Sequence, residues 1–527
     1  MSYSKPNASK ATSTKLRTPE SVSPFSGMCT NCLDGCLGPC EVGQSAYRGR
    51  EVIYPQPYGK ITSASEKDYP VDFSHFNIMG TAVGAYGIEA DSDKAIFPVV
   101  SLESEIGADN KFKLKMPFVI PGLGSTDIAG QNWEGLAVGA ALTGSILVIG
   151  ENVCGMDPNV QIENGKVVHS PNLAARVKAF KDWYNGYGMI VVQSNVEDTK
   201  LGVLEYAIKE LGVEAVELKW GQGAKNIGGE VKLQTLERAL ELKQRGYIVL
   251  PDPENAAVQE AFKAGAFKEF ERHSRIGMVD EESFLSRVKE LRELGAKYVF
   301  LKTGAYRPAD LARAVKFASK ARIDLLTVDG AGGGTGMSPW RMMNEWGVPT
   351  VYLESLLYQY LETLKDAGKF IPSVAIAGGF SLEDQVYKGF ALGAPYIKAV
   401  GIGRAALSAA MVGKTIGKLV QEDKLPKEMA AKYGNTVDSL FTCSAKLKEE
   451  LGEKFAEIPP GALGVYSYFD RLTLGMQQLM CGARKFALQY IERDDLAALT
   501  PEASQVSGIP FIMDVDKEEA KKILLSS

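Results

Sequence analysis

Hydrophobic and polar residues alternate in a way that divides the chain into three zones. From about residue 106 to residue 410, short runs rich in Val, Ile and Leu are separated by longer stretches with apolar residues at helical spacing. Apolar runs without a polar face, separated by helices, are typical of parallel strands that are buried on both sides. The runs that predict strands are 117–122, 145–150, 189–193, 215–220, 247–251, 297–302, 324–330, 373–379 and 396–403.

These candidate strands suit an eight-stranded barrel if one of them lies outside it, and we expect 247–251 to be the extra one. Residues suited to chemistry recur at the carboxyl ends of successive strands, where the active sites of (β/α)8 barrels lie. An open doubly wound sheet is the alternative, but no GxGxxG motif follows the first predicted strand. We therefore predict an α/β fold with a (β/α)8 TIM barrel over residues 106–410.

The two flanking zones have different patterns. Residues 1–105 begin with a polar, Ser- and Thr-rich stretch that we expect to be a disordered tail, followed by an irregular region that contains clustered cysteines. Residues 411–527 predict a helical carboxyl-terminal extension, as in KLKEELGEKFAEI and FDRLTLGMQQLMCGARKFAL. The expected organisation is an amino-terminal cysteine-cluster region, a barrel and a helical extension.

Composition narrows the class of protein. The chain has 527 residues and a net charge of -5, which gives no basic patch for nucleic acid. No apolar run is long enough to span a membrane, and the amino terminus lacks the apolar core of a secretory signal. We expect a cytoplasmic protein that acts on a small-molecule substrate, without a membrane span.

Glycine is concentrated at the ends of the last three predicted barrel strands. Backbone amides without side chains allow an anion to approach closely, and the last strands of such barrels often bind phosphate. Tight turns alone are the alternative interpretation. The candidate cofactor-binding residues at these strand ends are Asp329, Gly333, Gly334, Gly378, Gly379, Gly401, Gly403 and Arg404.

Two lysines lie at strand ends inside otherwise apolar runs. Lys219 ends VELK and Lys302 ends VFLK. An unpaired lysine is costly to bury, so each needs a partner. Beside a reduced flavin, either ammonium would stabilise the negative charge at the N1–C2 carbonyl edge of the ring. A structural ion pair inside the barrel is the alternative.

Four motifs in the same order resemble the FMN-binding synthase domain of the glutamate synthase large-subunit family, in its archaeal-type form without a glutaminase domain. The resemblance covers roughly residues 110–410 and continues more weakly into the closing helix. The motifs are GENVCGMDP (150–158), GQGAKNIGG (221–229), DGAGGGTGMSP (329–339) and AIAGGFSLEDQVYKGFALGAPYIKAVGIGR (375–404).

The resemblance implies an oxidoreductase with a barrel that binds FMN, its phosphate lying near Gly334, Gly378, Gly379, Gly401 and Gly403. Gln193 and Lys302 would face the isoalloxazine ring, and Glu151 and Lys225 would lie near the substrate. In this family a hydride passes from reduced FMN to 2-iminoglutarate, which forms from 2-oxoglutarate and ammonia. The activity implied is that of an enzyme acting on CH–NH2 donors.

The substrate half of the resemblance is weaker than the flavin half. Glu230 stands where the family has a glutamine, and a carboxylate there repels a dianionic 2-oxo acid unless it is protonated or paired. The arginine expected further on has no clear counterpart, since only Lys243 and Arg245 lie nearby. Glu230 therefore joins Lys302, Glu151 and Lys225 as a candidate catalytic residue, as a determinant of the acceptor.

Cys29, Cys32, Cys36 and Cys40 follow the spacing CxxCxxxCxxxC. Four thiolates suit either a tetrahedral zinc site or a cubane iron–sulfur cluster. Zinc sites usually divide their ligands between two separate knuckles, so the single compact loop favours a 4Fe-4S cluster, with zinc or free thiols as alternatives. The three-iron cluster cysteines that the family carries after the last strand have no counterpart here. Cys154 lies in the predicted active-site loop.

These observations predict a glutamate synthase-like iron–sulfur flavoprotein. Electrons would enter at the cluster from ferredoxin or a reductase subunit, pass to FMN and leave as a hydride to an imine. One alternative is an FMN-dependent oxidoreductase with a different substrate on the same barrel. Another is an electron-transfer subunit of a larger redox complex. We expect a homo-oligomer or a hetero-complex.

Overall fold

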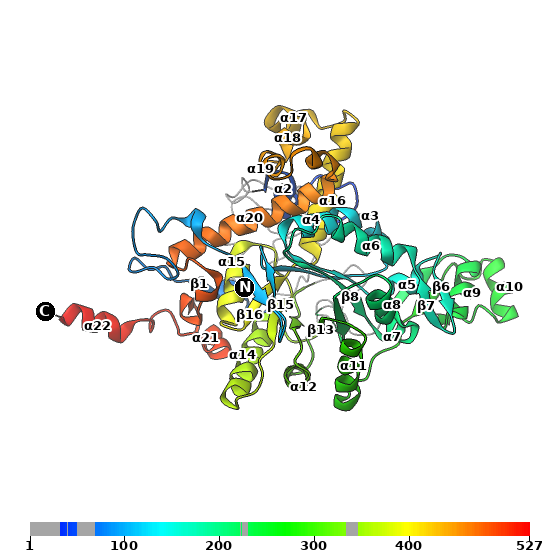
Figure 1. The fold of residues 1–527 in the computed structure, drawn as a ribbon, viewed down its shortest axis with the longest axis horizontal. Coiled ribbons are helices and arrows are strands. Elements are labelled where there is room, and N and C mark those ends of the chain that lie inside the picture. The colour runs from blue at the N-terminus through cyan, green and yellow to red at the C-terminus, as the bar shows by residue number, and fades with distance from the viewer. Residues whose placement is uncertain are drawn as a thin grey trace, which may run out of the picture.

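Eight parallel strands close into a barrel at the centre of the molecule (Figure 1). The computed structural model describes residues 32–38, 40–49, 69–221, 223, 230–333 and 346–526. The barrel strands are β4 (Phe118–Leu123), β5 (Ile146–Ile149), β8 (Met189–Ser194), β9 (Ala215–Lys219), β13 (Tyr298–Thr303), β14 (Leu325–Asp329), β15 (Ser373–Ala377) and β16 (Ile397–Gly401). Each pairs in parallel with the next, and β16 pairs with β4, which confirms the predicted (β/α)8 barrel.

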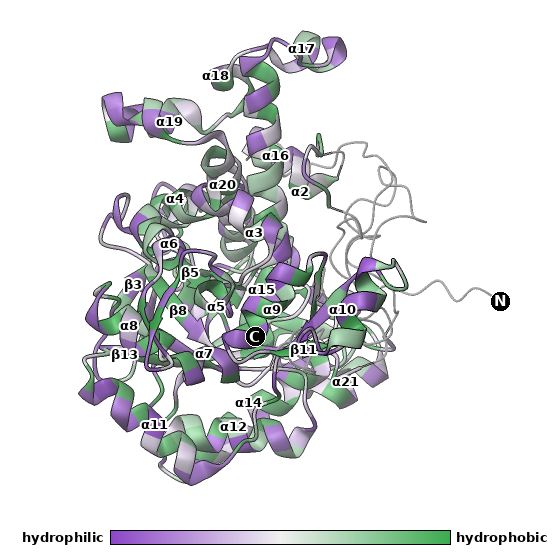
Figure 2. Cartoon of the chain, turned by 90° about the vertical axis from the view of Figure 1, so that its right-hand side faces the viewer, coloured by the Kyte–Doolittle hydropathy of each residue, from purple (hydrophilic) through white to green (hydrophobic). Residues whose placement is uncertain are grey.

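Helices surround the barrel, and local signals in the sequence set several of their ends. Asp280 caps α11 (Glu281–Glu293) by accepting a hydrogen bond from the Ser283 amide, and Pro308 occupies the first turn of α12 (Pro308–Lys320). Apolar residues of these helices face the strands and polar residues face outward (Figure 2). The helices are α3 (Asp127–Gln131), α4 (Trp133–Thr143), α6 (Pro171–Lys181), α7 (Val196–Leu201), α8 (Val203–Lys209), α11 (Glu281–Glu293), α12 (Pro308–Lys320), α14 (Thr350–Asp366), α15 (Glu383–Leu392) and α16 (Arg404–Gln421).

Side chains of the barrel strands point alternately outward and inward, which produces two separate apolar layers. Outward residues such as Val299 and Leu301 join the large core between the strands and the helices. Their neighbours Tyr298 and Phe300 join a smaller cluster that fills the barrel. Because side chains alternate with a period of two, each inward position fixes the next one two residues later.

A short hairpin closes the amino-terminal end of the barrel. Its strands are β2 (Ser104–Ile106) and β3 (Phe112–Leu114). Ile106 and Leu114 belong to the cluster inside the barrel. The Phe112 ring lies edge-on to Tyr298 and stacks on Phe300, with centroid separations of 5.0 and 6.2 Å. The bottom of the barrel is therefore an apolar core.

A small antiparallel sheet is inserted between β9 and the helix that precedes β13. Its strands lie in the order β10–β12–β11, and β11 shows that run 247–251 lies outside the barrel, as predicted. Leu233, Leu242 and Phe270 form its own apolar core. Its elements are β10 (Glu230–Leu233), α9 (Leu236–Gln244), β11 (Ile248–Leu250), α10 (Ala256–Lys263) and β12 (Phe270–His273).

Further segments lie along one side of the barrel and at its ends (Figure 1). Helix α2 (Glu41–Arg48) packs against α16 and α20 (Pro460–Gly482), which also contacts α4. Within the described residues, no helix has the length and apolar character needed to cross a bilayer. The other α-helices and strands of the described residues are β1 (Phe76–Ile78), α5 (Val153–Met156), β6 (Gln161–Glu163), β7 (Lys166–His169), α17 (Lys427–Tyr433), α18 (Val437–Leu440), α19 (Ser444–Leu451), β17 (Leu496–Ala498), α21 (Pro501–Ser507) and α22 (Lys517–Leu525).

Candidate active site at the carboxyl end of the barrel

The inward positions become polar at the carboxyl end of four neighbouring strands. Phe300 lies inside the barrel, so Lys302, two residues later on β13, also points inward. The same alternation carries Gln193 inward on β8 and Thr327 inward on β14, and on β9 it carries Glu217 and Lys219 inward. The strands thus place a layer of charged and polar side chains directly above the apolar core.

Lys302 is the central cation of this layer. It is 4% exposed, and its Nζ lies 3.1 Å from the Asp329 carboxylate. Burial alone lowers the pKa of Lys302, but the nearby carboxylates of Asp329, Glu217 and Glu151 outweigh burial and raise the pKa above its ordinary value. Lys302 therefore remains charged, as a fixed positive group at the base of the site.

Glu217 is a site residue that the sequence interpretation missed. Its Oε1 accepts a hydrogen bond of 2.6 Å from Gln193 Nε2, and the residue is 1% exposed. Burial raises the pKa of Glu217, against the opposing effect of Lys302. The spacing in the sequence does indicate this position, because Glu217 precedes Lys219 by two residues and so lies on the same face of the strand.

Glu151 and Lys219 meet at the rim of the barrel. The Lys219 Nζ donates a hydrogen bond of 2.6 Å to Glu151 Oε1. Burial raises the pKa of Glu151, but the Lys219 ammonium overcomes this effect and holds the pKa below its usual range. Both lysines predicted at strand ends thus form ion pairs, which fits the structural alternative and leaves them placed beside the site.

A buried acid fixes the loop that carries Glu151. The Asn152 amide donates to Asp198 Oδ2 at 2.9 Å, and Asn152 has a left-handed φ of 65°. Burial raises the pKa of Asp198 to about 7. Asp198 is at the start of α7, where it also accepts from the Asn195 amide. Nothing in the order of residues along the chain indicated this contact.

Arg245 holds the other end of the same loop. Its Nη1 donates to the carbonyls of Gly155 and Asp157 at 2.8 and 2.7 Å. Lys243, the other basic residue near the expected clamp position, forms an ion pair of 2.9 Å with Glu254. Cys154 is fully buried, and burial raises the pKa of its thiol, so the thiol is protonated and screened from solvent.

The opposite side of the site consists of glycine-rich strand ends. Gly378 has a φ of +123°, and a Cβ there would lie 2.4 Å from Thr350 Oγ1. The Thr350 hydroxyl donates to the Gly378 carbonyl at 2.6 Å, and its amide donates to Ala331. A Cβ at Gly333 would lie 3.2 Å from Gly378. Only glycine fits at Gly378, and Thr350 joins the ends of β14 and β15.

Gly401, Gly403 and Arg404 lead from β16 into α16. Helix α16 has 18 residues and begins at Arg404, so its free amides face the glycine-rich end of the strand. Burial lowers the pKa of the Arg404 guanidinium. Within the described ranges, no carboxylate pairs with Arg404. The amides and this cation together suit a phosphate group.

The site also contains buried polar atoms that lack partners. In the described part of the chain, Gln193 Oε1 and Thr327 Oγ1 are buried without a hydrogen bond. Both lie on inward positions of the polar layer. Unsatisfied buried polar atoms are unusual in native structures and often mark the position of a bound group. The polar layer, the glycine ends and these two atoms fit a ligand with a polar ring and a phosphate.

Three predicted residues, Lys225, Gly334 and Cys29, lie outside the described residues. The backbone of Glu230 begins β10, where it is opposite His273 in the inserted sheet. Gly379 follows Gly378 and has a φ of +110°. The structure therefore brings together Gln193, Lys219, Lys302, Asp329 and Glu151, with Gly333, Gly378, Gly379, Gly401, Gly403 and Arg404 on the strand ends of the same face.

Two of the predicted cluster cysteines lie near each other at the start of α2. Cys40 is the N-cap of this helix, and its Sγ accepts from the Gly43 amide at 3.4 Å. Cys36 Sγ accepts from the Gly38 amide at 3.3 Å. Burial raises the pKa of Cys36, the Gly38 amide opposes this, and Cys40 raises the pKa further. Amide donors to sulfur suit thiolates that bind a metal cluster.

The cysteine segment packs on the helix that starts at the glycine end of β16. Cys32 Sγ lies 2.8 Å from Ser408 Oγ on α16, and Asp34 forms an ion pair of 3.1 Å with Lys414 on the same helix. Cys32 also interacts electrostatically with Arg404. The segment is therefore held beside the start of α16, close to the candidate phosphate-binding residues.

The described residues contain no group of three or more His, Cys, Asp or Glu side chains arranged to hold a metal ion. Cys29, the first of the four cysteines, is outside this part of the chain.

Comparison with known proteins supports the motif-based assignment. A family model described as the conserved region in glutamate synthase matches residues 272–414. The chain is 26% identical to a glutamate synthase large subunit-like protein of Rhizobium meliloti, over 86% of this chain and 90% of that protein. It is 29% identical to the archaeal glutamate synthase [NADPH] of Archaeoglobus fulgidus, over 45% of this chain and 44% of that protein.

Solved structures with a similar course of the chain include a chimera of (S)-mandelate dehydrogenase. It is 14% identical, with 87% of this chain and 91% of that chain covered and a TM-score of 0.45. A lactate oxidase of Pediococcus acidilactici is 15% identical, with 79% and 81% covered and a TM-score of 0.40. The sequence matches confirm that the chain carries a glutamate synthase-like domain.

Proposed function

We propose that this glutamate synthase-like chain is an FMN-dependent oxidoreductase that reduces 2-iminoglutarate or a related imine. The observation that carries the proposal is the polar layer around Lys302, which faces glycine-rich strand ends across the carboxyl end of the barrel. The matches to glutamate synthases support the same reaction class.

Residues on both sides of the site would hold FMN. The phosphate would lie on the amides near Gly378, Gly401 and Gly403 and pair with Arg404. Gln193 and Lys302 would face the ring. FMN, when bound, supplies the hydride that reduces the acceptor carbon.

The chain's own residues set the electrostatics around the acceptor. Lys302 keeps its proton because its pKa is raised, so it acts as a fixed charge and not as a base. Glu151 stays ionised because Lys219 lowers its pKa. Its carboxylate suits recognition of ammonia or of a cationic imine nitrogen at the rim. Asp329 and Glu217 hold the Lys302 ammonium in place.

A 4Fe-4S cluster on Cys29, Cys32, Cys36 and Cys40 would supply single electrons to the flavin. The contacts of the cysteine segment with Ser408 and Lys414 support this role, because they hold the segment against α16. The electron donor in this proposal is ferredoxin or a reductase subunit. A carrier subunit without substrate chemistry would have little use for the paired Glu151 and Lys219 at the rim.

Flavin binding is tested with Arg404→Met, and Lys418→Met is the matched control. Both cations lie on α16, but Lys418 is 71% exposed and pairs with Glu422. We expect the dissociation constant for FMN to rise about tenfold in Arg404→Met, because a charged phosphate contact is lost. Fluorescence quenching of FMN on titration measures it. Equal affinity in both variants contradicts the assigned phosphate site.

The cluster is tested by iron and sulfide analysis of anaerobically purified protein. Cys36→Ser should lose iron together with the broad visible absorption, whereas Cys481→Ser, which changes a cysteine outside the motif, should retain both. A colourless wild-type protein that contains zinc would overturn the cluster.

The acceptor is tested by glutamate formation from 2-oxoglutarate, ammonia and a reduced low-potential donor. If Glu230 selects against 2-oxoglutarate, Glu230→Gln should bind this acid more tightly. An FMN-dependent oxidoreductase with another substrate is the second candidate, and Glu230 is the observation that favours it. That candidate is supported if the wild-type flavin is reducible but 2-oxoglutarate and ammonia do not reoxidise it.

A further inference from the structure

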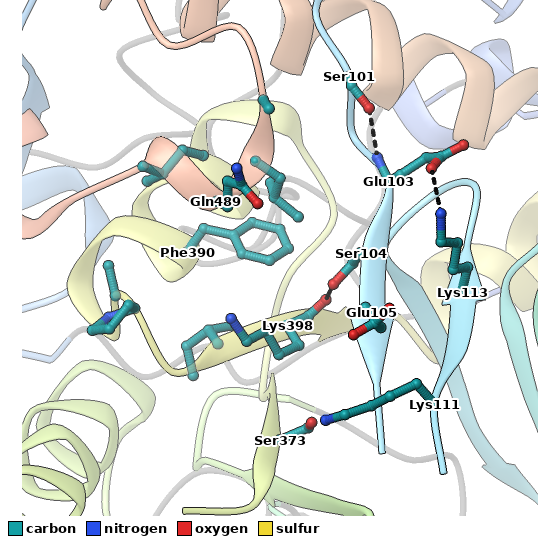
Figure 3. A pocket seen from close by; sticks show the side chains of 16 residues that line it. Ser101, Glu103, Ser104, Glu105, Lys111, Lys113, Ser373, Phe390, Lys398 and Gln489 are labelled. Carbon is teal, nitrogen blue, oxygen red and sulfur yellow. Dashed lines mark hydrogen bonds and ion pairs between the residues drawn. The ribbon is translucent and has the colours of Figure 1, made fainter. Parts of the chain in front are cut away.

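A cavity of about 550 Å³ lies on the amino-terminal side of the barrel, away from the proposed flavin site (Figure 3). The β2–β3 hairpin forms one wall. The start of β16, the end of α15 and residues 487–489 and 491 form the others. None of these lining residues belongs to the polar layer around Lys302.

A β-bulge directs Lys398 into this cavity. Val374 on β15 pairs with Ile397, and the next residue, Ala375, pairs with Ala399. Lys398 is therefore the extra residue of β16 and has no partner on β15. Its carbonyl instead accepts a hydrogen bond of 2.6 Å from Ser104 Oγ on the hairpin. Bulges commonly redirect a side chain in this way.

Lys398 differs from the other lysines that line the cavity. Lys111 donates to the Gly107 carbonyl, and Lys113 lies 3.7 Å from the Glu103 carboxylate. Across the described lining, the Lys398 ammonium has neither a hydrogen bond nor an ion pair. Burial lowers the pKa of Lys398, Lys111 lowers it further, and Glu105 opposes them. A half-buried cation without a partner is costly and calls for an anion.

The other residues that line the cavity indicate the chemical character of that anion. Phe390, Leu488 and Ile491 give the cavity an apolar wall, and Figure 3 shows the Phe390 ring near Lys398. Glu103 and Glu105 on the hairpin oppose a second negative charge. The cavity therefore suits one anionic group attached to an apolar body.

We propose that this cavity is a binding site for a small organic monocarboxylate with an aliphatic or aromatic body. The carboxylate pairs with the Lys398 ammonium, and the body packs on Phe390 and Leu488. The site is separate from the flavin site and does not depend on the proposed reaction.

Benzoate is the probe, and benzamide and acetate are its comparators. Isothermal titration calorimetry of the full-length protein should show benzoate binding, with weaker binding of benzamide, which lacks the charge, and of acetate, which lacks the body. Lys398→Met should weaken benzoate binding about tenfold and leave benzamide binding unchanged. Lys398→Arg should retain benzoate binding, and Lys297→Met, outside the cavity at the same end of the barrel, should match the wild type.

Thermal unfolding of each variant shows whether it is folded. Benzoate affinity that is equal in the wild type and in folded Lys398→Met would overturn the proposal. Benzamide binding as tightly as benzoate, or the absence of saturable benzoate binding by the wild type, would overturn it as well. If Lys398→Met does not fold, Lys398→Arg and the benzamide comparison still decide the outcome.

Discussion

The two ends of the barrel are built from the same strands but have opposite character. At the amino-terminal end, inward residues such as Tyr298 and Phe300 pack with the β2–β3 hairpin in a closed apolar core. Two residues further along the same strand, Lys302 faces the site with Glu217 and Asp329 around it. One end is therefore optimised for packing, and the other keeps charged groups together at an energetic cost.

Within a few residues of the same strand, the side chains that stabilise the barrel give way to the side chains that form the site. An apolar side chain inside the barrel gains free energy by leaving water. A buried charge loses the free energy of its hydration, and only ion pairs and hydrogen bonds with its partners offset that loss. Substitutions at the first end should thus mainly change stability, whereas those at the second should mainly change flavin chemistry.

Phe300→Ala should produce the largest change, and at the packed end. The ring is fully buried and stacks on Phe112, so its removal leaves a cavity inside the barrel. We expect a loss of about 3–5 kcal/mol in the free energy of unfolding. Urea denaturation followed by fluorescence measures this change. A loss below about 1 kcal/mol would contradict the tight packing of this end.

Lys302→Met should have its main effect on the rate. It removes the central cation and leaves Asp329 and Glu217 without it. We expect reoxidation of the reduced flavin by its acceptor to slow about 100-fold, by loss of electrostatic stabilisation. Stopped-flow absorbance measures the rate, and the midpoint potential of bound FMN should fall in the same variant.

Thr303→Val is the matched control for Lys302→Met. Thr303 is the next residue of β13, faces away from the barrel interior and has a buried hydroxyl with no partner among the described residues. The flavin rate should stay within about twofold of the wild type, because the change lies on the outer face of the strand. A loss of rate as large as that in Lys302→Met would contradict the different roles of the inward and outward faces of β13.

Asp198→Asn should change the pH dependence of stability at the carboxyl end. The folded carboxyl has a pKa of about 7, raised from 3.8. Between these values the folded state holds a proton that the unfolded state has released, so stability falls as pH rises. The wild type should lose about 3–4 kcal/mol across this window. Unfolding by urea at pH 4, 5.5 and 7 should show a flatter profile in Asp198→Asn; identical profiles would rule out this role.

Gly378→Ala should lower stability at the glycine-rich end of β15. The residue has a φ of +123°, and the added Cβ would crowd the Thr350 hydroxyl. We expect a cost of about 2–4 kcal/mol, because the backbone is strained and the Cβ would also lie 2.6 Å from the Gly330 carbonyl oxygen. FMN affinity should fall in the same variant, whereas Gly368→Ala, where a Cβ meets open space, should leave FMN affinity unchanged. Unchanged FMN affinity in Gly378→Ala would move the phosphate site away from β15.

Much of the site was predictable, because the inward and outward alternation of side chains depends only on neighbouring residues of the same strand. The runs at 117–122, 297–302 and 396–403 became barrel strands, and the extra run 247–251 lies outside the barrel. Lys219 and Lys302 point inward as their positions suggested. Glu217 could have been found by the same rule, but it was missed because only the lysines at the strand ends were considered.

Other contacts were not predictable, because they join residues far apart in the chain. The Lys219–Glu151 pair spans 68 positions, and the Cys32–Ser408 contact spans 376. Thr350 joins the ends of β14 and β15 only after the chain has passed through residues 334–345. Such pairs depend on the register in which the barrel closes, which no local pattern encodes.

Local patterns along the chain specify where the strands lie, which positions face inward and which strand ends are rich in glycine. The physical reason is the two-residue repeat of a strand together with the special backbone freedom of glycine. Three features follow only from the folded chain: which carboxylate neutralises each lysine, where the cysteine segment packs, and that a bulge directs Lys398 into a cavity. Those outcomes depend on strand register and helix packing, which bring distant residues within the few ångströms over which charges and hydrogen bonds act.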